Sequence, residues 1–190
     1  MKLPVSAHTS RPWRIHELTR DFRVEDVWSL PTPGAPDDFP RLVTLIASGR
    51  PFRNSSTATR GLWAIRQTAG RLLGLDAPQA GPGGSVASLR DRLTADLREA
   101  TGPHVRAAMF SSLYLLDDEW AGELANRTVH AVLHVGWVED GADGYLGQMT
   151  ILTRPNGLSG AGYMAAIRPF RQMIVYPAAI REIERYWKAL

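Results

Sequence analysis

The sequence predicts an α+β domain in which a run of antiparallel strands leads into a long C-terminal helix. Apolar residues recur every three or four positions in residues 39–46 and again from residue 163 onward, as on one face of a helix. Between residues 110 and 153 apolar residues occupy alternate positions, as in strands with a buried face. The chain has 190 residues, of which 44% are hydrophobic, enough for the core of one domain.

The first third of the chain mixes these two patterns. Residues 1–10 follow neither and are expected to form a flexible N-terminal arm, ahead of a single domain over residues 11–190. Residues 21–30 alternate as a strand does, although Asp26 interrupts the apolar face. A helix is expected from residue 39, because two aspartates immediately before it can cap its first turn.

A second helix is expected over residues 57–73, and a third, weaker one over residues 85–97. Between them, residues 76–84 are rich in glycine and proline, which favours a flexible surface loop. A phosphate-binding loop would need a P-loop lysine or the pattern G-x-G-x-x-G, and the chain contains neither. We therefore expect no cofactor.

The second half of the chain predicts four successive strands and then a helix. Short turns separate the strands, so they are expected to form an antiparallel meander. The expected strands cover residues 110–116, 120–125, 129–137 and 145–153. The helical pattern that follows contains Pro169 and Pro177, which are expected to kink or break it.

Composition excludes several classes of function. The chain has no cysteine, which excludes disulfides, thiol catalysis and cysteine-based zinc sites. A net charge of +3 is too small to predict a dominant nucleic-acid-binding surface. No secretory signal and no uncharged apolar segment long enough to cross a bilayer is visible, so a cytoplasmic protein without a transmembrane segment is expected.

Two stretches carry a family resemblance. The first runs from Asp21 to Gly34 and continues with Asp37-Asp38-Phe39-Pro40. The second includes Arg127-Thr128-Val129-His130, Gly136-Trp137 and two segments of the C-terminal helix, residues 163–171 and 175–177. On these residues the chain resembles the bacterial family called domain of unknown function 2867, over residues 11–188.

That family is similar to the START-like, or SRPBCC, superfamily. The resemblance implies a helix-grip fold, in which a curved antiparallel sheet wraps on a long, proline-kinked C-terminal helix. Such folds usually have six or seven strands, whereas the patterns above give five, and residues 76–100 have no obvious counterpart. The resemblance further implies a cavity between sheet and helix that holds an apolar or amphipathic small molecule, and it carries over no catalytic residue.

The candidate ligand-binding residues lie on the expected strands and the long helix. The face of strand 129–137 that ends in Trp137 is the more apolar one and is the expected cavity wall. Aromatic residues at this spacing belong to a core more often than to a pocket, so a structural role is the alternative. The candidates are Trp28, Trp120, Trp137, Tyr145, Met149, Tyr163 and Ile167, with Arg168 for an anionic group of the ligand.

Two histidines and two glutamates could carry acid–base chemistry. His130 and His134 share one face of a strand, as do Glu119 and Glu123. Residues four apart on a strand are separated by about 13 Å, too far to chelate one metal or to act as a glycosidase carboxylate pair. The histidines are therefore expected to be sheet-surface or hydrogen-bonded residues, with a single acid–base histidine as the alternative, and no metal is expected.

Three hypotheses for function follow. The first is binding of an apolar small molecule in the sheet–helix cavity. The second is an enzyme on the same cavity, of the cyclase, dehydratase or hydrolase type, with His130 or His134 as the acid–base group. The third is a non-catalytic interaction module or a membrane-surface module. Separately, a homodimer is a possible assembly of the chain.

Overall fold

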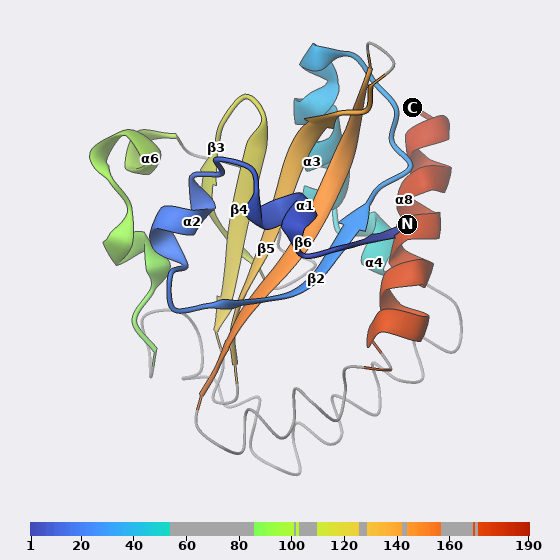
Figure 1. Cartoon of the computed structure of the whole chain (residues 1–190). Coiled ribbons are helices and arrows are strands. Elements are labelled where there is room, and N and C mark those ends of the chain that lie inside the picture. Colours follow the sequence, from blue (N-terminus) through green and yellow to red (C-terminus); the bar gives the residue numbers. More distant parts are fainter. Residues whose placement is uncertain are drawn as a thin grey trace.

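The computed structural model describes residues 1–53, 86–100, 102, 110–125, 129–141, 144–156, 169 and 171–190 (Figure 1). Its centre is a six-stranded, curved sheet in the order β1-β2-β6-β5-β4-β3, with every neighbouring pair antiparallel. The strands are β1 (Lys2–Leu3), β2 (Arg23–Ser29), β3 (Ser111–Leu115), β4 (Glu119–Ala125), β5 (Val129–Glu139) and β6 (Tyr145–Pro155). The α+β class and the four-stranded meander are confirmed.

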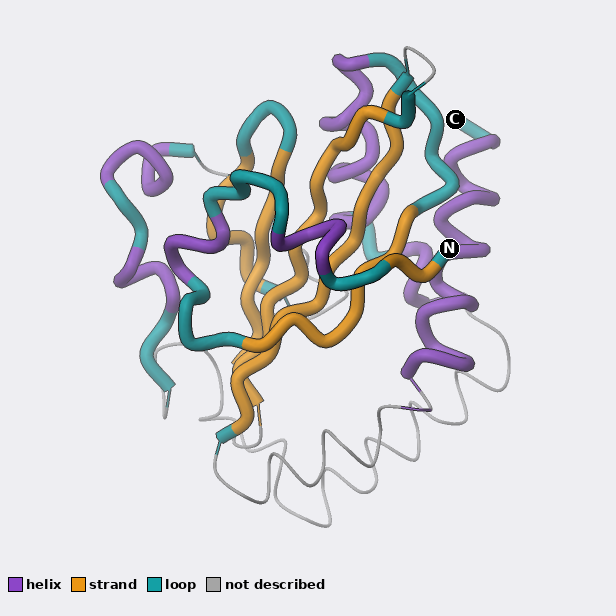
Figure 2. Tube along the Cα trace, in the orientation of Figure 1, coloured by secondary structure: helices purple, strands orange, loops and turns teal. Residues whose placement is uncertain are grey.

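Helical segments cover both faces of this sheet (Figures 1 and 2). We call one side the helix face. It packs against α3 (Phe39–Ala47) and α8 (Tyr176–Lys188), and α4 (Arg50–Arg53) contacts both of these helices. We call the other side the cover face. It packs against short segments from two parts of the chain: α1 (Ser6–Thr9), α2 (Ile15–Leu18), η2 (Leu89–Arg92) and α6 (Ala95–Glu99).

The core is therefore divided into two clusters by the sheet. On the helix face, Leu42 and Ile46 of α3 and Ile183 of α8 are fully buried against the strands. On the cover face, Leu89 and Leu97 are buried in the same way. Both faces of the central strand β5 are consequently inside the protein, and its burial is nearly continuous along its length.

A β-bulge in β2 decides where the residues of this strand point. Val24 pairs with Leu152 and Asp26 pairs with the next residue, Ile151, so residue 25 is extra on its strand. The bulge places Val24 with the cover-face cluster, whereas Asp26 and Trp28 point to the helix face. The sequence pattern had put these residues on a single face, because an inserted residue is invisible to a strict alternation.

The N-terminal residues differ from the expected flexible arm. Lys2 and Leu3 pair with Trp28 and Val27 of β2, which adds β1 to the sheet. Helix α1 follows directly, and His8 within it is completely buried. The pairing corrects the expected strand count from five to six.

The predicted helices have mixed outcomes. The helix from residue 39 is confirmed as α3, preceded by the short helical turn η1 (Pro36–Asp38). The third helix is interrupted, because Leu93 and Thr94 are extended between η2 and α6. The second helix and the loop over residues 76–84 lie outside the described residues.

An irregular helical segment directly precedes α8. Arg171–Val175 form a π-helical segment, η3, that continues directly into α8. Pro177 lies in the first turn of α8, where a missing backbone N–H costs least. The departure from regular helix thus falls in η3, between Pro169 and Pro177, the two prolines that were expected to kink or break the helix.

Candidate functional site

The cover face holds the two glutamates and two histidines singled out in the sequence. The pairing of β4 with β5 brings each glutamate beside one histidine. His130 Nε2 lies 3.0 Å from Glu123 Oε2, and His134 Nε2 lies 3.8 Å from Glu119 Oε1. All four side chains are buried, so a sheet-surface position for the histidines is wrong, and His130 is hydrogen-bonded as the other alternative had it.

Glu119 holds the second helix of the chain on the sheet. Its carboxylate accepts hydrogen bonds from the backbone N–H groups of Arg14 at 2.9 Å and Ile15 at 3.2 Å, where α2 begins. It also accepts one from the Tyr114 hydroxyl. Burial alone would raise the pKa of Glu119, but His134, Tyr114 and the backbone donors outweigh burial and lower it. An ionised carboxylate therefore caps α2.

Glu123 does the same for the segment that contains η2. It accepts hydrogen bonds from Leu89 N at 2.9 Å, from the Ser88 hydroxyl and from His130. These donors lower the pKa of Glu123 although burial opposes them. The two carboxylates thus attach two covering segments, which are far apart in the sequence, to neighbouring positions on the sheet.

This arrangement bears directly on the acid–base hypothesis. A general acid or base must come within hydrogen-bond reach of a reacting group. Glu119 and Glu123 are instead occupied by backbone donors of the segments that cover them. Among the described residues, no group of three His, Asp or Glu side chains could hold a metal ion. A catalytic role for His130 or His134 stays a prediction.

A third buried histidine was missed at the sequence level. His8 lies with its ring 5.0 Å from that of His134 and 4.8 Å from that of His16. Trp13 packs beside them, with its ring centroid 5.1 Å from that of His134. Its indole also lies over Gly136 of β5, where a Cβ atom would come within 2.7 Å of the ring, so only glycine fits there. His8 gave no signal in the sequence because it lies in a segment without periodicity.

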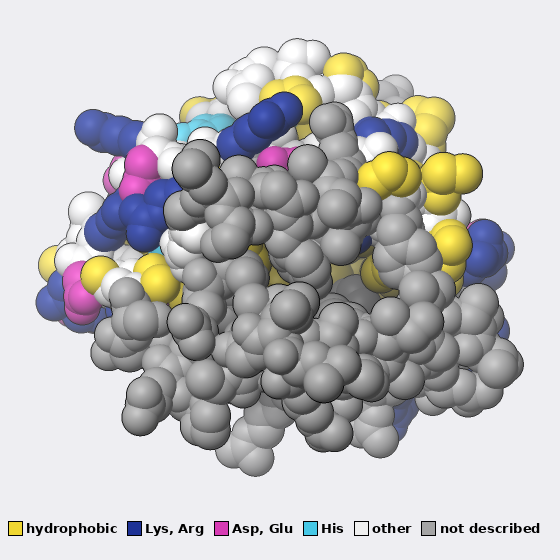
Figure 3. Space-filling model, turned by 90° about the horizontal axis from the view of Figure 1, so that it is seen from below, with side chains coloured by type: hydrophobic (Ala, Val, Ile, Leu, Met, Phe, Trp, Pro, Cys, Tyr) yellow, Lys and Arg dark blue, Asp and Glu magenta, His cyan; other side chains and the backbone are white. Residues whose placement is uncertain are grey.

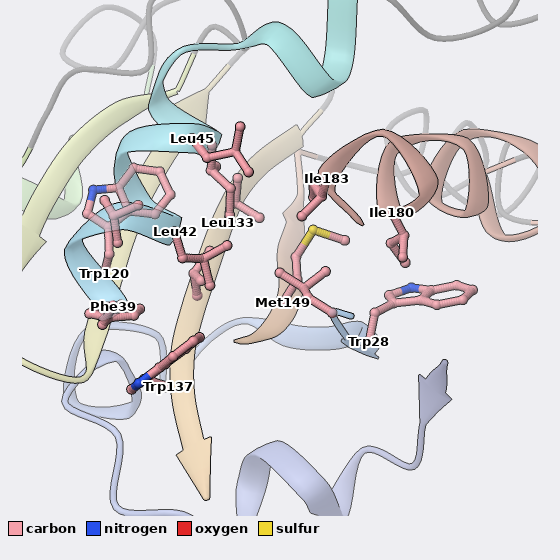
Figure 4. Close-up of a cluster of buried hydrophobic side chains, with 14 of the residues drawn as sticks. Trp28, Phe39, Leu42, Leu45, Trp120, Leu133, Trp137, Met149, Ile180 and Ile183 are labelled. Carbon is pink, nitrogen blue, oxygen red and sulfur yellow. The ribbon is translucent and has the colours of Figure 1, made fainter. Parts of the chain in front are cut away.

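The apolar candidates among the described residues lie on the helix face, and two of them are packed into the core (Figure 4). The Trp137 indole donates to Ala35 O at 3.0 Å, and its ring stacks on Tyr145. The Trp120 indole donates to Ser112 Oγ at 3.0 Å. Since their polar atoms are satisfied and their rings are packed, these side chains serve the fold. Ligand contacts by them stay predictions.

Trp28 and Met149 have different surroundings. They pair across β2 and β6 and lie beneath α8, with Met149 directed toward Ile183 in Figure 4. The Trp28 ring lies 5.9 Å from Tyr176, and its indole N–H is buried without a hydrogen-bond partner. Tyr163, Ile167 and Arg168, the other candidates from the long helix, lie outside the described residues.

Next to Trp28 is a polar cluster around the buried Asp26, which we call the Asp26 cluster: Lys2, Glu25, Asp26, Arg171 and Gln172. Asp26 is 1% exposed; its Oδ1 accepts from Gln172 Nε2 at 2.5 Å and lies 3.3 Å from Lys2 Nζ. Its Oδ2 is buried without a partner. Arg171 lies 3.6 Å from Glu25 but makes no hydrogen bond through Nε or this terminal nitrogen.

Comparison with known proteins gives the chain a family. The family model described as protein of unknown function (DUF2867) matches residues 18–178. The chain belongs to the DUF2867 family. None of the curated proteins compared with it matches. Among the described residues, no helix is both long and apolar enough to cross a membrane.

The residues matched by DUF2867 include most of the Asp26 cluster and both glutamate–histidine pairs of the cover face. Asp26, Trp28 and the two glutamate–histidine pairs all lie within residues 18–178. Lys2 and His8 lie before it, in the segment that forms β1 and α1. The Asp26 cluster therefore combines residues of the family domain with Lys2 from the preceding segment.

Proposed function

We propose that this DUF2867 protein binds a small amphipathic molecule on the helix face, between β2, β6 and the start of the C-terminal helix. The proposal includes the relationship to START-like proteins, which hold apolar ligands between a curved sheet and such a helix. The observation that carries it is the Asp26 cluster. One carboxylate oxygen of Asp26, two guanidinium nitrogens of Arg171 and the neighbouring indole N–H of Trp28 are buried without a hydrogen-bond partner, at the edge of an apolar core.

Buried polar groups without partners are costly. Each such group forfeits about 1–3 kcal/mol relative to a satisfied one, and native proteins contain few of them. On the helix face the groups without partners gather near the first turns of the C-terminal helix: Asp26 Oδ2, Trp28 Nε1 and two Arg171 nitrogens. A few convergent polar groups beside apolar side chains are typical of a ligand site.

The chemistry of the cluster limits the polar end of the ligand. Two acidic side chains, Glu25 and Asp26, face Lys2 and Arg171. Arg23 also lies 3.9 Å from Glu25, but 72% of its side chain is exposed, so water screens its charge. Because the four less exposed charges balance, the favoured polar end is neutral or zwitterionic. It would donate to Asp26 Oδ2 and accept from Arg171 or the Trp28 indole.

The apolar part of the ligand would lie against Trp28 and Met149. Tyr176 supports the same region. Burial raises the pKa of its hydroxyl to about 12, Arg171 opposes this shift, and Asp26 and Glu25 add to it, so the hydroxyl stays neutral and can donate. Tyr163, Ile167 and Arg168 stay proposed contacts of this ligand. In the view from below, hydrophobic side chains of described residues reach the surface among charged ones (Figure 3).

The test is a native mass spectrum of the gently purified protein beside its denatured mass. The expected result is an extra mass that is lost on denaturation. Trp28→Phe should lose it, because the ligand would lack both the indole donor and part of its apolar contact.

Trp13→Phe is the matched control. Trp13 is also buried with an unpartnered indole N–H, but it lies on the cover face. It should keep the extra mass. A wild-type spectrum without any retained mass, together with no binding of dodecanamide added as a neutral amphipathic probe, would contradict the proposal.

A further inference from the structure

A stack of imidazoles fixes the N-terminal segment on the cover face. The rings of His16, His8 and His134 follow one another with centroid separations of 4.8 and 5.0 Å, each pair edge to face. His8 Nδ1 lies 3.2 Å from Thr150 Oγ1 of β6. His8 is the only buried residue of α1, so this helix is anchored in the core by an ionisable side chain.

The same segment reaches the opposite face of the sheet through its other end. Lys2 pairs with Trp28, and its side chain lies on the helix face, 3.3 Å from Asp26. Residues 2–8 thus include the edge strand β1 and continue into α1, from the Asp26 cluster on one face to the imidazole stack on the other (Figure 2). We call residues 1–10 the strap.

We propose that the strap is an acid-released latch: protonation of His8 detaches it from the cover face and withdraws Lys2 from Asp26. The release would thereby regulate the ligand site, and this second part rests on the proposed function. When Lys2 leaves Asp26, the cluster loses one positive charge and becomes more negative. Acid would therefore favour a ligand whose polar end is cationic.

The surroundings of His8 explain why its protonation is incompatible with the closed strap. The ionisable side chains that act on it are two further imidazoles, His16 from α2 and His134 from β5. The neighbour from β6 is the hydroxyl of Thr150. Glu119 of β4 is separated from His8 by His134 and already accepts from α2 and Tyr114.

Other charged groups near the stack do not compensate a proton on His8. From the segment beside α2, Arg11 lies over Trp13, and the Arg14 side chain pairs with Glu17 and Asp96. From the β3–β4 turn, Asp118 interacts electrostatically with His134. Burial, followed by His134 and His16, lowers the pKa of His8 from 6.5 to about 2.

The size of the pH effect on strap opening follows from the linkage between proton binding and opening. In the open strap His8 is solvated and titrates near 6.5, whereas in the closed strap it stays neutral down to about pH 2. Acid therefore favours the open form throughout that window. Between about pH 7.5 and pH 5.0 the opening constant should rise roughly 30-fold.

Hydrogen exchange tests the latch without any ligand. Exchange of the strap amides, normalised for the chemical exchange rate at each pH, should accelerate by about 30-fold between about pH 7.5 and pH 5.0, while β5 amides do not change. His8→Leu should abolish the acceleration. Thr150→Val, the matched control, removes the partner of His8 but leaves the imidazole, so the acceleration should persist.

Two results would overturn the latch. One is equal acceleration in wild type and His8→Leu, which would assign the proton to another group. The other needs no variant, in case His8→Leu does not fold: an NMR titration of wild type in which the His8 ring becomes protonated near pH 6.5 while the strap amides stay protected.

The regulatory part has its own arm. Lys2→Met should imitate release at about pH 7.5, raising the affinity for dodecylamine relative to dodecanamide while His8 stays in place. Unchanged selectivity, with both probes bound, would overturn the regulation and leave the latch intact. Failure of both probes to bind would contradict the proposed function instead.

Discussion

The two faces of the sheet are closed by different physical means. On the helix face, α3 and α8 pack apolar side chains such as Leu42 and Ile183 into the strands. On the cover face, short segments of four or five residues contribute fewer apolar contacts, and buried carboxylates attach two of them: Glu119 for α2 and Glu123 for η2.

The difference shows what short helices require. A helix of four residues has nearly all its backbone N–H groups unsatisfied and little apolar surface to bury. An acceptor supplied by the sheet solves the first problem and fixes the segment in place. Stability on the cover face should therefore depend on single polar groups and on pH, whereas stability on the helix face should depend on buried volume.

The largest expected effect is on the cover face. Glu119→Leu removes the acceptor of Arg14 N, Ile15 N and the Tyr114 hydroxyl at once, and should lower the free energy of unfolding by roughly 3–5 kcal/mol. Urea unfolding at about pH 7.5 measures it. Glu17→Gln, an exposed acidic residue on α2, is the control and should change it by less than about 0.5 kcal/mol. A loss below about 1 kcal/mol for Glu119→Leu would show that packing, not capping, attaches α2.

Leu42→Ala tests the helix face. Leu42 is fully buried on α3, and its truncation should lower the free energy of unfolding by about 3 kcal/mol through lost burial and the remaining cavity. The loss should be the same at about pH 7.5 and pH 5.0, since no ionisable group is involved. Thr44→Ala, on the exposed side of the same helix, is the reference. A loss that varies with pH would remove the contrast between the two faces.

The sequence predicted the helix face more completely than the cover face. Alternation located β3 to β6, and the apolar period of α3 located the helix face. It also placed Glu119 with Glu123, and His130 with His134, on common faces. The contacts between the glutamates and the histidines could also have been predicted. In a hairpin of these two strands, odd-numbered residues of one strand pair with even-numbered residues of the other, which places the glutamates beside the histidines. Considering each pair by itself missed these contacts.

Other features had no periodic signal. The bulge at residue 25 moves Asp26 relative to Val24 and can be seen only from the pairing with β6. Helices α1 and α2 are single turns, too short for a helical period, whereas η2 and α6 lie in the region whose apolar spacing predicted one helix over residues 85–97. His8 depends on a contact with residues more than a hundred positions away, which local pattern cannot reveal.

The cover face should also differ from the helix face in how its contribution to the free energy of unfolding depends on pH. The pKa of His8 is lower in the folded protein than its ordinary value of 6.5, so the unfolded chain binds the additional proton and stability falls as pH decreases below 6.5. At about pH 5.0 this group should have removed about 2 kcal/mol. The lowered pKa values of Glu119 and Glu123 act later, because their contribution is complete above 4.5 and is lost only below it.

Urea unfolding at several pH values checks this order. His8→Leu should flatten the curve between about pH 5 and 7.5 and leave the steeper loss below 4.5 in place. An unchanged curve in the variant would mean that His8 is already solvated in the folded protein.

The smallest effect concerns the rim of the cover face, where Asp21 joins two elements through exposed charges. It accepts from Arg92 of η2 at 2.5 Å and from Arg154 of β6 at 2.6 Å. Hydrogen bonds from Arg92 lower the pKa of Asp21, burial opposes them, and Arg154 adds to the lowering. The carboxyl is 40% exposed, so water and salt screen the pairs.

Asp21→Asn should lower the free energy of unfolding by less than about 1 kcal/mol, and the loss should vanish in high salt. A larger, salt-independent loss in urea unfolding would mean that the rim, and not Glu123 beneath it, attaches η2 to the sheet.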